Sequence, residues 1–328
     1  MSEMAVNGRP LNGSLVTVFG GSGFLGRHVV RALAEQGYRI RVAVRRPQLA
    51  GFLRPMGAVG QIEPVQANVR FPDSVAHVMQ GSDAVVNLVG ILSEGGRQRY
   101  DKVHVEGAKD VAEAAARIGA RLVHVSALGA DPKATSAYGR SKADGEAAVR
   151  AAKPDAVILR PSLLFGSDDD FFNRFAAMAR VAPVVPLVGG GKTRFQPIFV
   201  SDAAKVVQKA VDGDALSGTI YELGGPEVRS FRELLDLTQR EIGTSRPYLN
   251  LSFGMAGFLA GLTQWIPGAP LTSDQVALLR SDNVVSAAAE AEGRVLSAFG
   301  ITPAALSIVL PSYLWRFRKA GQFTHLEA

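Results

Sequence analysis

A glycine-rich turn between a short apolar strand and a helix is the feature that most constrains the fold of this chain. The stretch LVTVFGGSGFLGRHVV reads as a buried strand, a turn with glycines at Gly20, Gly23 and Gly26, and a helix that begins near Gly23. Glycines at this spacing permit a tight turn, a close approach to a pyrophosphate and close packing of helix on strand. The free N–H groups of the helix also favour phosphate. The stretch predicts a dinucleotide site; an ordinary strand–helix turn with flexible glycines is the alternative.

Strands and helices alternate through the first half of the chain. After the first strand and helix we expect strands at 39–44, 62–66, 84–89, 122–126 and 156–160, and helices at 73–79, 101–118 and 138–153. This rhythm predicts an α/β fold with a doubly wound parallel sheet, the Rossmann architecture. The domains expected are a flexible N-terminus at 1–13, an NADP-binding domain at 14–165 and a mixed α/β lobe at 166–328, from which 201–224 returns to the sheet.

The second half has a looser pattern. Expected elements are a helix at 170–180, a Pro/Gly-rich loop at 181–192, a helix capped by Ser201 or Asp202, a strand at 219–223 and a helix at 230–242. A last helix is expected to begin at Thr302-Pro303 and to end in the basic and aromatic stretch Tyr313–Lys319.

Composition excludes several classes of site. The 328 residues include no cysteine, which rules out disulfides and thiolate chemistry, and the five histidines show no ligand spacing, so no metal site is expected. The formal charge of +6 suggests an acidic neighbour, but no basic run with interleaved aromatics points to nucleic acid. The N-terminus has no apolar signal region. We therefore expect a protein that stays in a bacterial cytoplasm, or a mature form that has lost its presequence.

Two arginines follow the expected second strand. Arg45 and Arg46 stand where an Asp or Glu would bind the ribose hydroxyl of NAD. Guanidinium groups at this place suit the 2′-phosphate of NADP. The sequence therefore predicts NADPH rather than NADH, with a solvated basic loop as the alternative.

A serine, a tyrosine and a lysine form a second constellation. Tyr138 and Lys142 are four residues apart and share one helix face, and a lysine ammonium near a phenol lowers the pKa of the phenol. Ser126 ends the expected fifth strand, at the edge where open α/β sheets bind ligands. The three residues predict an acid/base site; a surface Tyr–Lys pair is the alternative.

The chain resembles the extended or atypical short-chain dehydrogenase/reductase family. The motifs that match this family occur in the same order: the glycine loop, Asn87, Ser126, Tyr138 with Lys142, and the stretch from Arg160 to Gly166. The resemblance implies that Tyr138 is the acid/base, Lys142 holds the nicotinamide ribose and Ser126 holds the substrate oxygen. His104 stands where many extended members carry an asparagine, which puts their proton relay in doubt here. The expected cofactor-binding residues are Gly20, Ser22, Gly23, Phe24, Leu25, Gly26, Arg45, Arg46, Asn68, Val69, Asn87, Tyr138, Lys142 and Pro161.

Longer stretches narrow the resemblance, among them LVHVSALGADPKATSAYGRSKADGE and LTSDQVALLRSDN. They are similar to the family of NADPH-binding accessory subunits of respiratory complex I, in its alphaproteobacterial form. That resemblance implies a tightly held, mainly structural NADPH and complex I partner subunits near the junction of the peripheral and membrane arms. It also implies a peripheral position at the cytoplasmic face of the bacterial inner membrane, without a transmembrane helix. A stand-alone NADPH-dependent reductase or epimerase-type enzyme, using Ser126, Tyr138 and Lys142, is the alternative, and a redox-sensing regulator is a third class.

The segment 247–273 carries no charge, and within it 253–266 is an apolar run too short to span a bilayer. It is either a buried helix of the second lobe or an exposed patch that contacts partner subunits or lipid.

Overall fold

A computed structural model describes residues 13–263 and 272–323. The expected flexible residues 1–12 lie outside this part, as do Trp265 and Ile266 at the end of the apolar run. The chain forms two compact units. The first unit combines the chain up to Pro161 with Val200–Leu223 and Ser286–Thr302; the second combines Ser162–Phe199, Gly224–Val285 and the chain from Pro303.

A seven-stranded sheet with the order β11-β6-β5-β4-β1-β2-β3 forms the centre of the first unit. All of its pairings are parallel, so the predicted doubly wound Rossmann fold is confirmed. The order reverses between β1 and β4, the place where such sheets bind ligands. The strands are β1 Leu15–Phe19, β2 Arg39–Val44, β3 Ile62–Gln66, β4 Ala84–Asn87, β5 Arg121–Val125, β6 Val157–Pro161 and β11 Ile220–Leu223.

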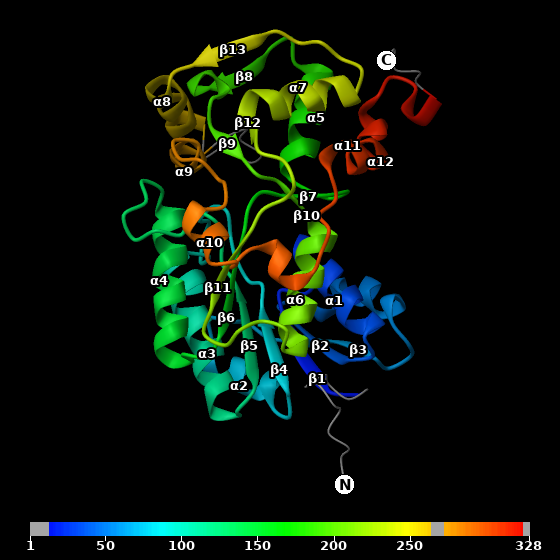
Figure 1. Ribbon diagram of the computed structural model, residues 1–328, viewed down its shortest axis with the longest axis vertical. Coiled ribbons are helices and arrows are strands. Elements are labelled where there is room, and N and C mark those ends of the chain that lie inside the picture. The colour runs from blue at the N-terminus through cyan, green and yellow to red at the C-terminus, as the bar shows by residue number, and fades with distance from the viewer. Residues whose placement is uncertain (1–12, 264–271, 324–328) are drawn as a thin grey trace. The chain divides into compact units, whose positions relative to one another are not determined.

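Helices cover both faces of this sheet, which explains why its strands are apolar almost throughout. Figure 1 shows α1 and α6 on one face and α2, α3 and α4 on the other. Small side chains of α3, among them Ala108, Ala112 and Ala115, are fully buried and bring the helix close to the sheet. The helices of the unit are α1 Phe24–Glu35, α2 Pro72–Met79, α3 Gly107–Arg117, α4 Ala137–Ala152, α6 Val200–Asp212 and α10 Ala287–Ala291.

The second unit has an aromatic core. Phe172, Phe175 and Phe231 are buried together with Tyr313 and Leu314, which lie close to the C-terminal limit of the described residues. Short two-stranded sheets surround this core: β7 Leu164–Phe165 with β10 Ile198–Phe199, β9 Arg194–Phe195 with β12 Arg229–Ser230, and β8 Val185–Val188 with β13 Tyr248–Leu251. The helices are α5 Phe171–Val181, α7 Phe231–Glu241, α8 Phe253–Thr263, α9 Ser273–Leu278, α11 Leu306–Val309 and α12 Pro311–Leu314.

Several expectations for the second half were wrong in detail. The expected loop 181–192 contains β8, whose partner β13 lies more than fifty residues later, so no local pattern announces it. The expected single last helix is broken into α11, α12 and a short turn at Trp315–Phe317, with Pro311 at the start of α12. Ser201 and Asp202 do not precede their helix, because α6 begins at Val200. The Ser201 hydroxyl pairs instead with Nδ1 of His28, at 3.1 Å.

Helix α8 is apolar on two faces. Ala256 and Ala260 are buried against α9, whereas Met255, Phe258 and Leu262 are 54%, 65% and 62% exposed. The described part of the apolar run is therefore an exposed surface as well as a packed helix. Within 13–263 and 272–323, no helix has both the length and the apolar character needed to cross a membrane.

Candidate dinucleotide site and its neighbouring Ser–Tyr–Lys cluster

The glycine turn has the geometry of a phosphate loop. Gly20 adopts a φ of +78°, which favours glycine, and its N–H bonds to the Ala43 carbonyl at 3.2 Å. A Cβ on Gly26 would lie 2.3 Å from the Gly20 carbonyl oxygen, so only glycine fits there. Gly23 is the N-cap of α1, and no side chain in the described part of the chain caps this helix. Its first N–H groups are therefore directed toward a ligand position rather than used internally.

A pocket of about 270 Å³ lies at this turn, at the carboxyl ends of β1, β2, β3 and β4. Four successive parallel strands contribute to it, on both sides of the point where the strand order reverses. This is the position at which doubly wound sheets bind dinucleotides. Lining residues from the sequence prediction are Gly20, Ser22, Gly23, Arg45, Asn68 and Val69.

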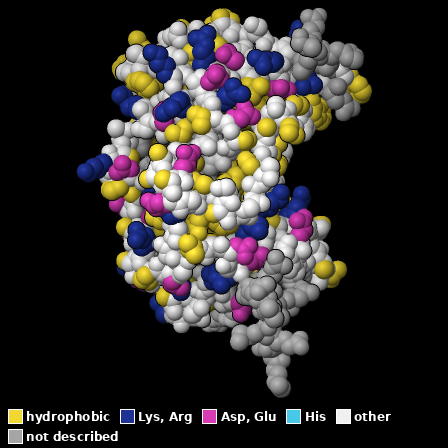
Figure 2. All heavy atoms as spheres, in the orientation of Figure 1, with side chains coloured by type: hydrophobic (Ala, Val, Ile, Leu, Met, Phe, Trp, Pro, Cys, Tyr) yellow, Lys and Arg dark blue, Asp and Glu magenta, His cyan; other side chains and the backbone are white. Residues whose placement is uncertain are grey.

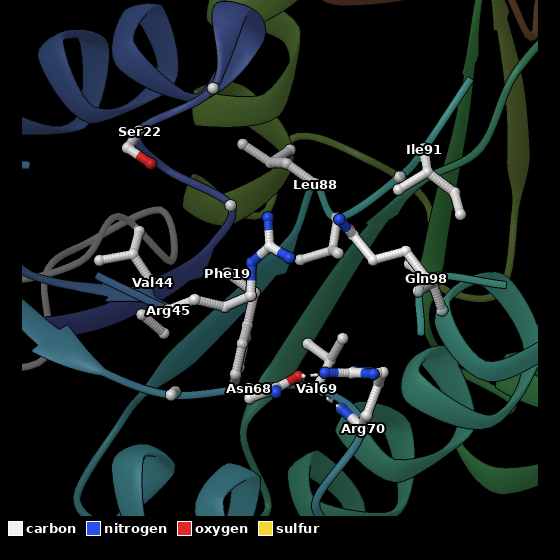
Figure 3. A pocket seen from close by; sticks show the side chains of 17 residues that line it. Phe19, Ser22, Val44, Arg45, Asn68, Val69, Arg70, Leu88, Ile91 and Gln98 are labelled. Carbon is white, nitrogen blue, oxygen red and sulfur yellow. Dashed lines mark hydrogen bonds between the residues drawn. The ribbon is translucent and has the colours of Figure 1, made fainter. Parts of the chain in front are cut away.

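Arg45 is the predicted arginine that lines the pocket, and Arg46 does not line it. Figure 3 shows the Arg45 side chain reaching into the pocket from the end of β2. A second arginine, Arg70, lines the pocket beside Asn68, whose amide oxygen accepts hydrogen bonds from the Arg70 backbone N–H at 3.2 Å and from Nε at 3.4 Å. Nη1 of Arg70 also donates to the Arg97 carbonyl at 2.8 Å. The lining of the pocket thus includes two arginines, Arg45 and Arg70.

The remaining predicted cofactor residues lie outside the pocket lining. Phe24, Leu25 and Gly26 form the start of α1 behind the turn, and Pro161 ends β6. Asn87 acts on the wall of the pocket, because its amide oxygen accepts the Val89 N–H at 3.1 Å. Sequence reasoning missed other lining residues, which lie at or after the ends of the expected third and fourth strands, or before and within the next expected helix: Ala67, Arg70, Leu88, Val89, Gly90, Ile91, Gln98 and Val103.

Ser126 and Lys142 are both buried behind this pocket in the first unit. Lys142 donates from Nζ to the Val125 carbonyl at 3.0 Å, and a Cβ on Gly90 would lie 4.0 Å from the same nitrogen. Burial lowers the pKa of Lys142 to about 8, although Glu146 acts in the opposite direction. The Ser126 hydroxyl has no hydrogen-bond partner in the described part of the chain. A buried hydroxyl of this kind can bind an oxygen atom of a substrate or cofactor.

Tyr138 lies in the first turn of α4, one turn before Lys142, as predicted from the spacing. Its ring centroid lies 5.6 Å from that of His104 and 6.1 Å from that of Tyr100, both edge-on. The expected lowering of the Tyr138 pKa by Lys142 stays a prediction.

His104 connects the pocket wall with α4. Nε2 accepts the Ile91 N–H at 3.0 Å, which assigns the ring proton to Nδ1; Nδ1 then donates to the Ser141 hydroxyl at 2.8 Å. The Ser141 hydroxyl donates in turn to the Tyr138 carbonyl at 2.8 Å. Burial, aided by the charge of Lys142, lowers the pKa of His104 to about 3, so the ring stays neutral. Both ring nitrogens are hydrogen-bonded, so His104 links the Ile91 wall of the pocket to Ser141 on α4.

Val103 and His104 lie in an unusual helix. Asp101–Glu106 forms a π-helix that leads into α3, where the sequence predicted one regular helix from 101 to 118. Such widened turns place a side chain where a regular helix would not, and they are frequent at functional sites.

A buried ion pair anchors α4 further along. Arg160 on β6 binds both carboxylate oxygens of Glu146, at 2.9 and 2.6 Å, and lies 3.6 Å from Glu222 on β11. Because Glu146 is one turn after Lys142, this bidentate pair holds the helix face that carries the lysine against the sheet.

Comparison with known proteins identifies the family to which this fold belongs. The model of the family described as NAD dependent epimerase/dehydratase matches residues 16–224. The chain belongs to this family. It is an extended short-chain dehydrogenase/reductase, and the ligand class of its dinucleotide pocket is accordingly a nicotinamide dinucleotide.

Three relatives illustrate the range of similar proteins. The chain is 34% identical over 289 residues to "NADH dehydrogenase [ubiquinone] 1 alpha subcomplex subunit 9, mitochondrial" of Arabidopsis thaliana, covering 84% of this chain and 72% of the relative. It is 28% identical over 317 residues to the "NADH-ubiquinone oxidoreductase 40 kDa subunit, mitochondrial" of Neurospora crassa, covering 95% and 82%. A ceramide reductase of Caulobacter vibrioides is 36% identical over 190 residues, covering 58% of each chain.

Among solved structures, the dTDP-glucose 4,6-dehydratase of Streptomyces venezuelae with NAD bound superposes with a TM-score of 0.69 at 19% identity, covering 92% of this chain and 96% of that one. This likeness supports the fold.

Proposed function

We propose that this chain is an accessory subunit of respiratory NADH:quinone oxidoreductase that holds NADPH mainly as a structural ligand. The observation that carries the proposal is the similarity to complex I subunits from Arabidopsis thaliana and Neurospora crassa, which extends over 84% and 95% of the chain. A ligand that binds only the folded state stabilises that state by mass action and needs no turnover.

The preference for NADPH over NADH rests on Arg45. Its side chain enters the pocket at the end of β2, where the adenosine ribose is held in doubly wound folds. A guanidinium group there pairs with a 2′-phosphate, and Arg70 adds a second positive charge to the same pocket. In this proposal the turn from Gly20 to Gly26 holds the pyrophosphate.

The place of the subunit is the cytoplasmic face of the inner membrane, beside the junction of the peripheral and membrane arms of the complex. The exposed apolar side chains of α8 support a position against partner subunits and lipid, because a patch of this kind on an isolated chain usually marks a contact surface.

A second candidate function is a stand-alone NADPH-dependent reductase. It is favoured by the unpartnered hydroxyl of Ser126, by the buried Lys142 and by the similarity to the Caulobacter ceramide reductase. In this reading Ser126 orients a substrate carbonyl, Tyr138 gives it a proton and Lys142 holds the nicotinamide ribose. The bound dinucleotide supplies the hydride.

Native electrophoresis of gently solubilised membranes, probed for this chain, tests the main proposal. Migration with the complex I band is expected; recovery only as a soluble monomer or dimer contradicts it. Replacing Tyr138 with Phe separates the two candidates, because an enzyme loses nearly all turnover whereas an accessory subunit still assembles. Tyr38→Phe, which removes a phenol hydroxyl bonded to Asp212 and lies outside both the pocket lining and α8, serves as the matched control.

A further inference from the structure

The second unit contains a pocket of its own, with a volume of about 400 Å³. It lies between the glycine turn after β8, the paired strands β9 and β12, and the first turn of α7. Its charged lining is one-sided, with a single acidic residue, Glu233, among four cations: Lys192, Arg194, Arg229 and Arg232. Figure 2 shows Lys and Arg side chains over the surface that holds β8, β12 and α7, with Asp, Glu and hydrophobic side chains between them.

The carboxylates that accompany these cations do not line the pocket. Ion pairs between such exposed groups contribute little to stability, so the guanidinium groups are available to another anion at small cost. Glu233 is already engaged, because it accepts the Ser230 N–H at 2.7 Å in a capping box. The ion pairs are Arg194 with Asp282, Arg229 with Glu227, and Arg232 with Asp236.

The exposed apolar helix α8 begins beside this pocket. β8 and β13 are paired up to Val188 and Leu251, and the chain continues from one end into the glycine turn and from the other into α8. The Phe253 ring fills the space in front of Gly189, where an added Cβ would lie 2.5 Å from it. The Arg280 guanidinium group also lies over the Phe253 ring, 5.0 Å from the ring centroid.

The exposed side chains of α8 lie on one helix face. Met255, Phe258 and Leu262 follow the i, i+3, i+7 spacing, and the helix contains no charged residue. A soluble phosphate compound would contact only the cations and would leave this apolar face of α8 exposed to water. Apolar side chains next to a group of cations match the acyl chains and phosphate groups of a bilayer surface.

We propose that the second unit binds bilayers rich in anionic phospholipids, with the four pocket cations at the lipid phosphate groups and Met255, Phe258 and Leu262 among the acyl chains. This inference deepens the proposed role beside a membrane. It assigns the lipid contact to named residues and to a lipid class.

Vesicle flotation of the purified full chain tests this proposal without the respiratory complex. Binding to vesicles of phosphatidylcholine with phosphatidylglycerol is expected to exceed binding to phosphatidylcholine alone and to weaken with added salt. Lys192→Ala with Arg232→Ala is expected to reduce binding to the mixed vesicles about 30-fold, since each cation near an anionic surface contributes about fivefold. Lys109→Ala with Arg117→Ala, which removes the same charge from α3, is the matched control and should have little effect.

The double variant Phe258→Ser with Leu262→Ser tests the contribution of the exposed apolar face of α8 to vesicle binding. It should weaken binding to both kinds of vesicle by at least about tenfold, and this loss should not depend on salt. Retained NADPH binding and an unchanged unfolding midpoint show that each variant is folded.

Three results would overturn the proposal. Equal binding to both vesicle compositions removes the role of the cations. Calorimetric binding of inorganic pyrophosphate without any vesicle binding makes the pocket a site for a soluble phosphate. Protection of α8 by purified complex I subunits, with no vesicle binding, makes the surface a protein interface. Because flotation uses the chain alone, a negative result leaves migration with complex I as a separate question.

Discussion

Helices α1 and α7 each begin at a pocket, but the N–H groups at their N-termini are satisfied in opposite ways. α1 starts after Gly23, with no side-chain cap and no acidic residue in its first turn. α7 starts after Ser230, whose hydroxyl accepts the Glu233 N–H while the Glu233 carboxylate accepts the Ser230 N–H. An open helix start offers N–H groups to a ligand, whereas a capping box uses them internally.

This difference between the two helix N-termini determines which groups of each pocket can bind an anion. The first pocket depends on backbone geometry, which glycine spacing fixes, and adds Arg45 at its edge. In the second pocket the helix start is occupied, so only the surrounding cations remain for a ligand. One site is therefore sensitive to the size of a residue and the other to charge.

The largest expected effect is that of Gly26→Ala. The added Cβ would lie 2.3 Å from the Gly20 carbonyl oxygen and must displace the phosphate loop. Overpacking of this kind costs up to about 3 kcal/mol, so NADPH affinity should fall about 100-fold. Fluorescence titration measures it, with Gly257→Ala as the control because its Cβ meets no atom within 4 Å. Unchanged affinity in Gly26→Ala would show that the loop does not hold the dinucleotide.

Arg45→Ala tests whether the first pocket also depends on a cation. Loss of a charge-assisted hydrogen bond should weaken NADPH binding about 10- to 100-fold and leave NADH binding unchanged. Arg46→Ala is the matched control, since Arg46 does not line the pocket. Equal losses in the two variants, measured as dissociation constants for both nucleotides, would remove Arg45 from the 2′-phosphate site.

Acid should weaken the first unit and not the second. Burial lowers the pKa of both His104 and His124 to about 3, below the ordinary 6.5 that they regain on unfolding. Between these values the unfolded chain binds more protons, so stability falls as the pH decreases from about 6.5 toward 3.

From pH 7 to pH 5 each histidine should lower the free energy of unfolding by about 2 kcal/mol. Hydrogen exchange of the sheet amides measures this loss, and the α7 amides serve as the internal reference because every histidine in the described residues lies in the first unit. His124→Gln should remove the part of this pH-dependent loss of stability that is due to His124. A pH response equal in both units contradicts the assignment.

The smallest effect concerns the capped helix. Ser230→Ala should lower the stability of α7 by about 1 kcal/mol, seen as faster exchange of its first amides, and should leave NADPH affinity unchanged. Ser136→Ala, which removes the cap of α4 from the Gly139 N–H, should have a similar cost near Tyr138. Weaker NADPH binding in Ser230→Ala would mean that the two pockets are not independent.

Local patterns predicted the sheet well, because each strand of a parallel sheet carries its own apolar run. The strands Arg39–Val44 and Ile62–Gln66 match the expectation residue for residue. The loop glycines were also predictable, since their role is set by the backbone next to them.

Features that depend on distant partners were not predictable. β8 contains Pro186 and becomes a strand only through β13. The His104 link to Ile91 and Ser141 joins three segments that no spacing connects. Which of two adjacent arginines faces the pocket depends on how the chain turns after β2, and a sequence of two like residues carries no such direction.

The first unit is built from three separated stretches of the chain, which has a consequence for synthesis. The pocket lining runs from Phe19 to Val103, so it is complete once the first third of the polypeptide has left the ribosome. β11 at Ile220–Leu223 joins the sheet much later, beside β6, at the edge remote from β3. A nascent chain should therefore acquire its nucleotide site early, and NADPH can act as a template that holds the half-built sheet while translation continues.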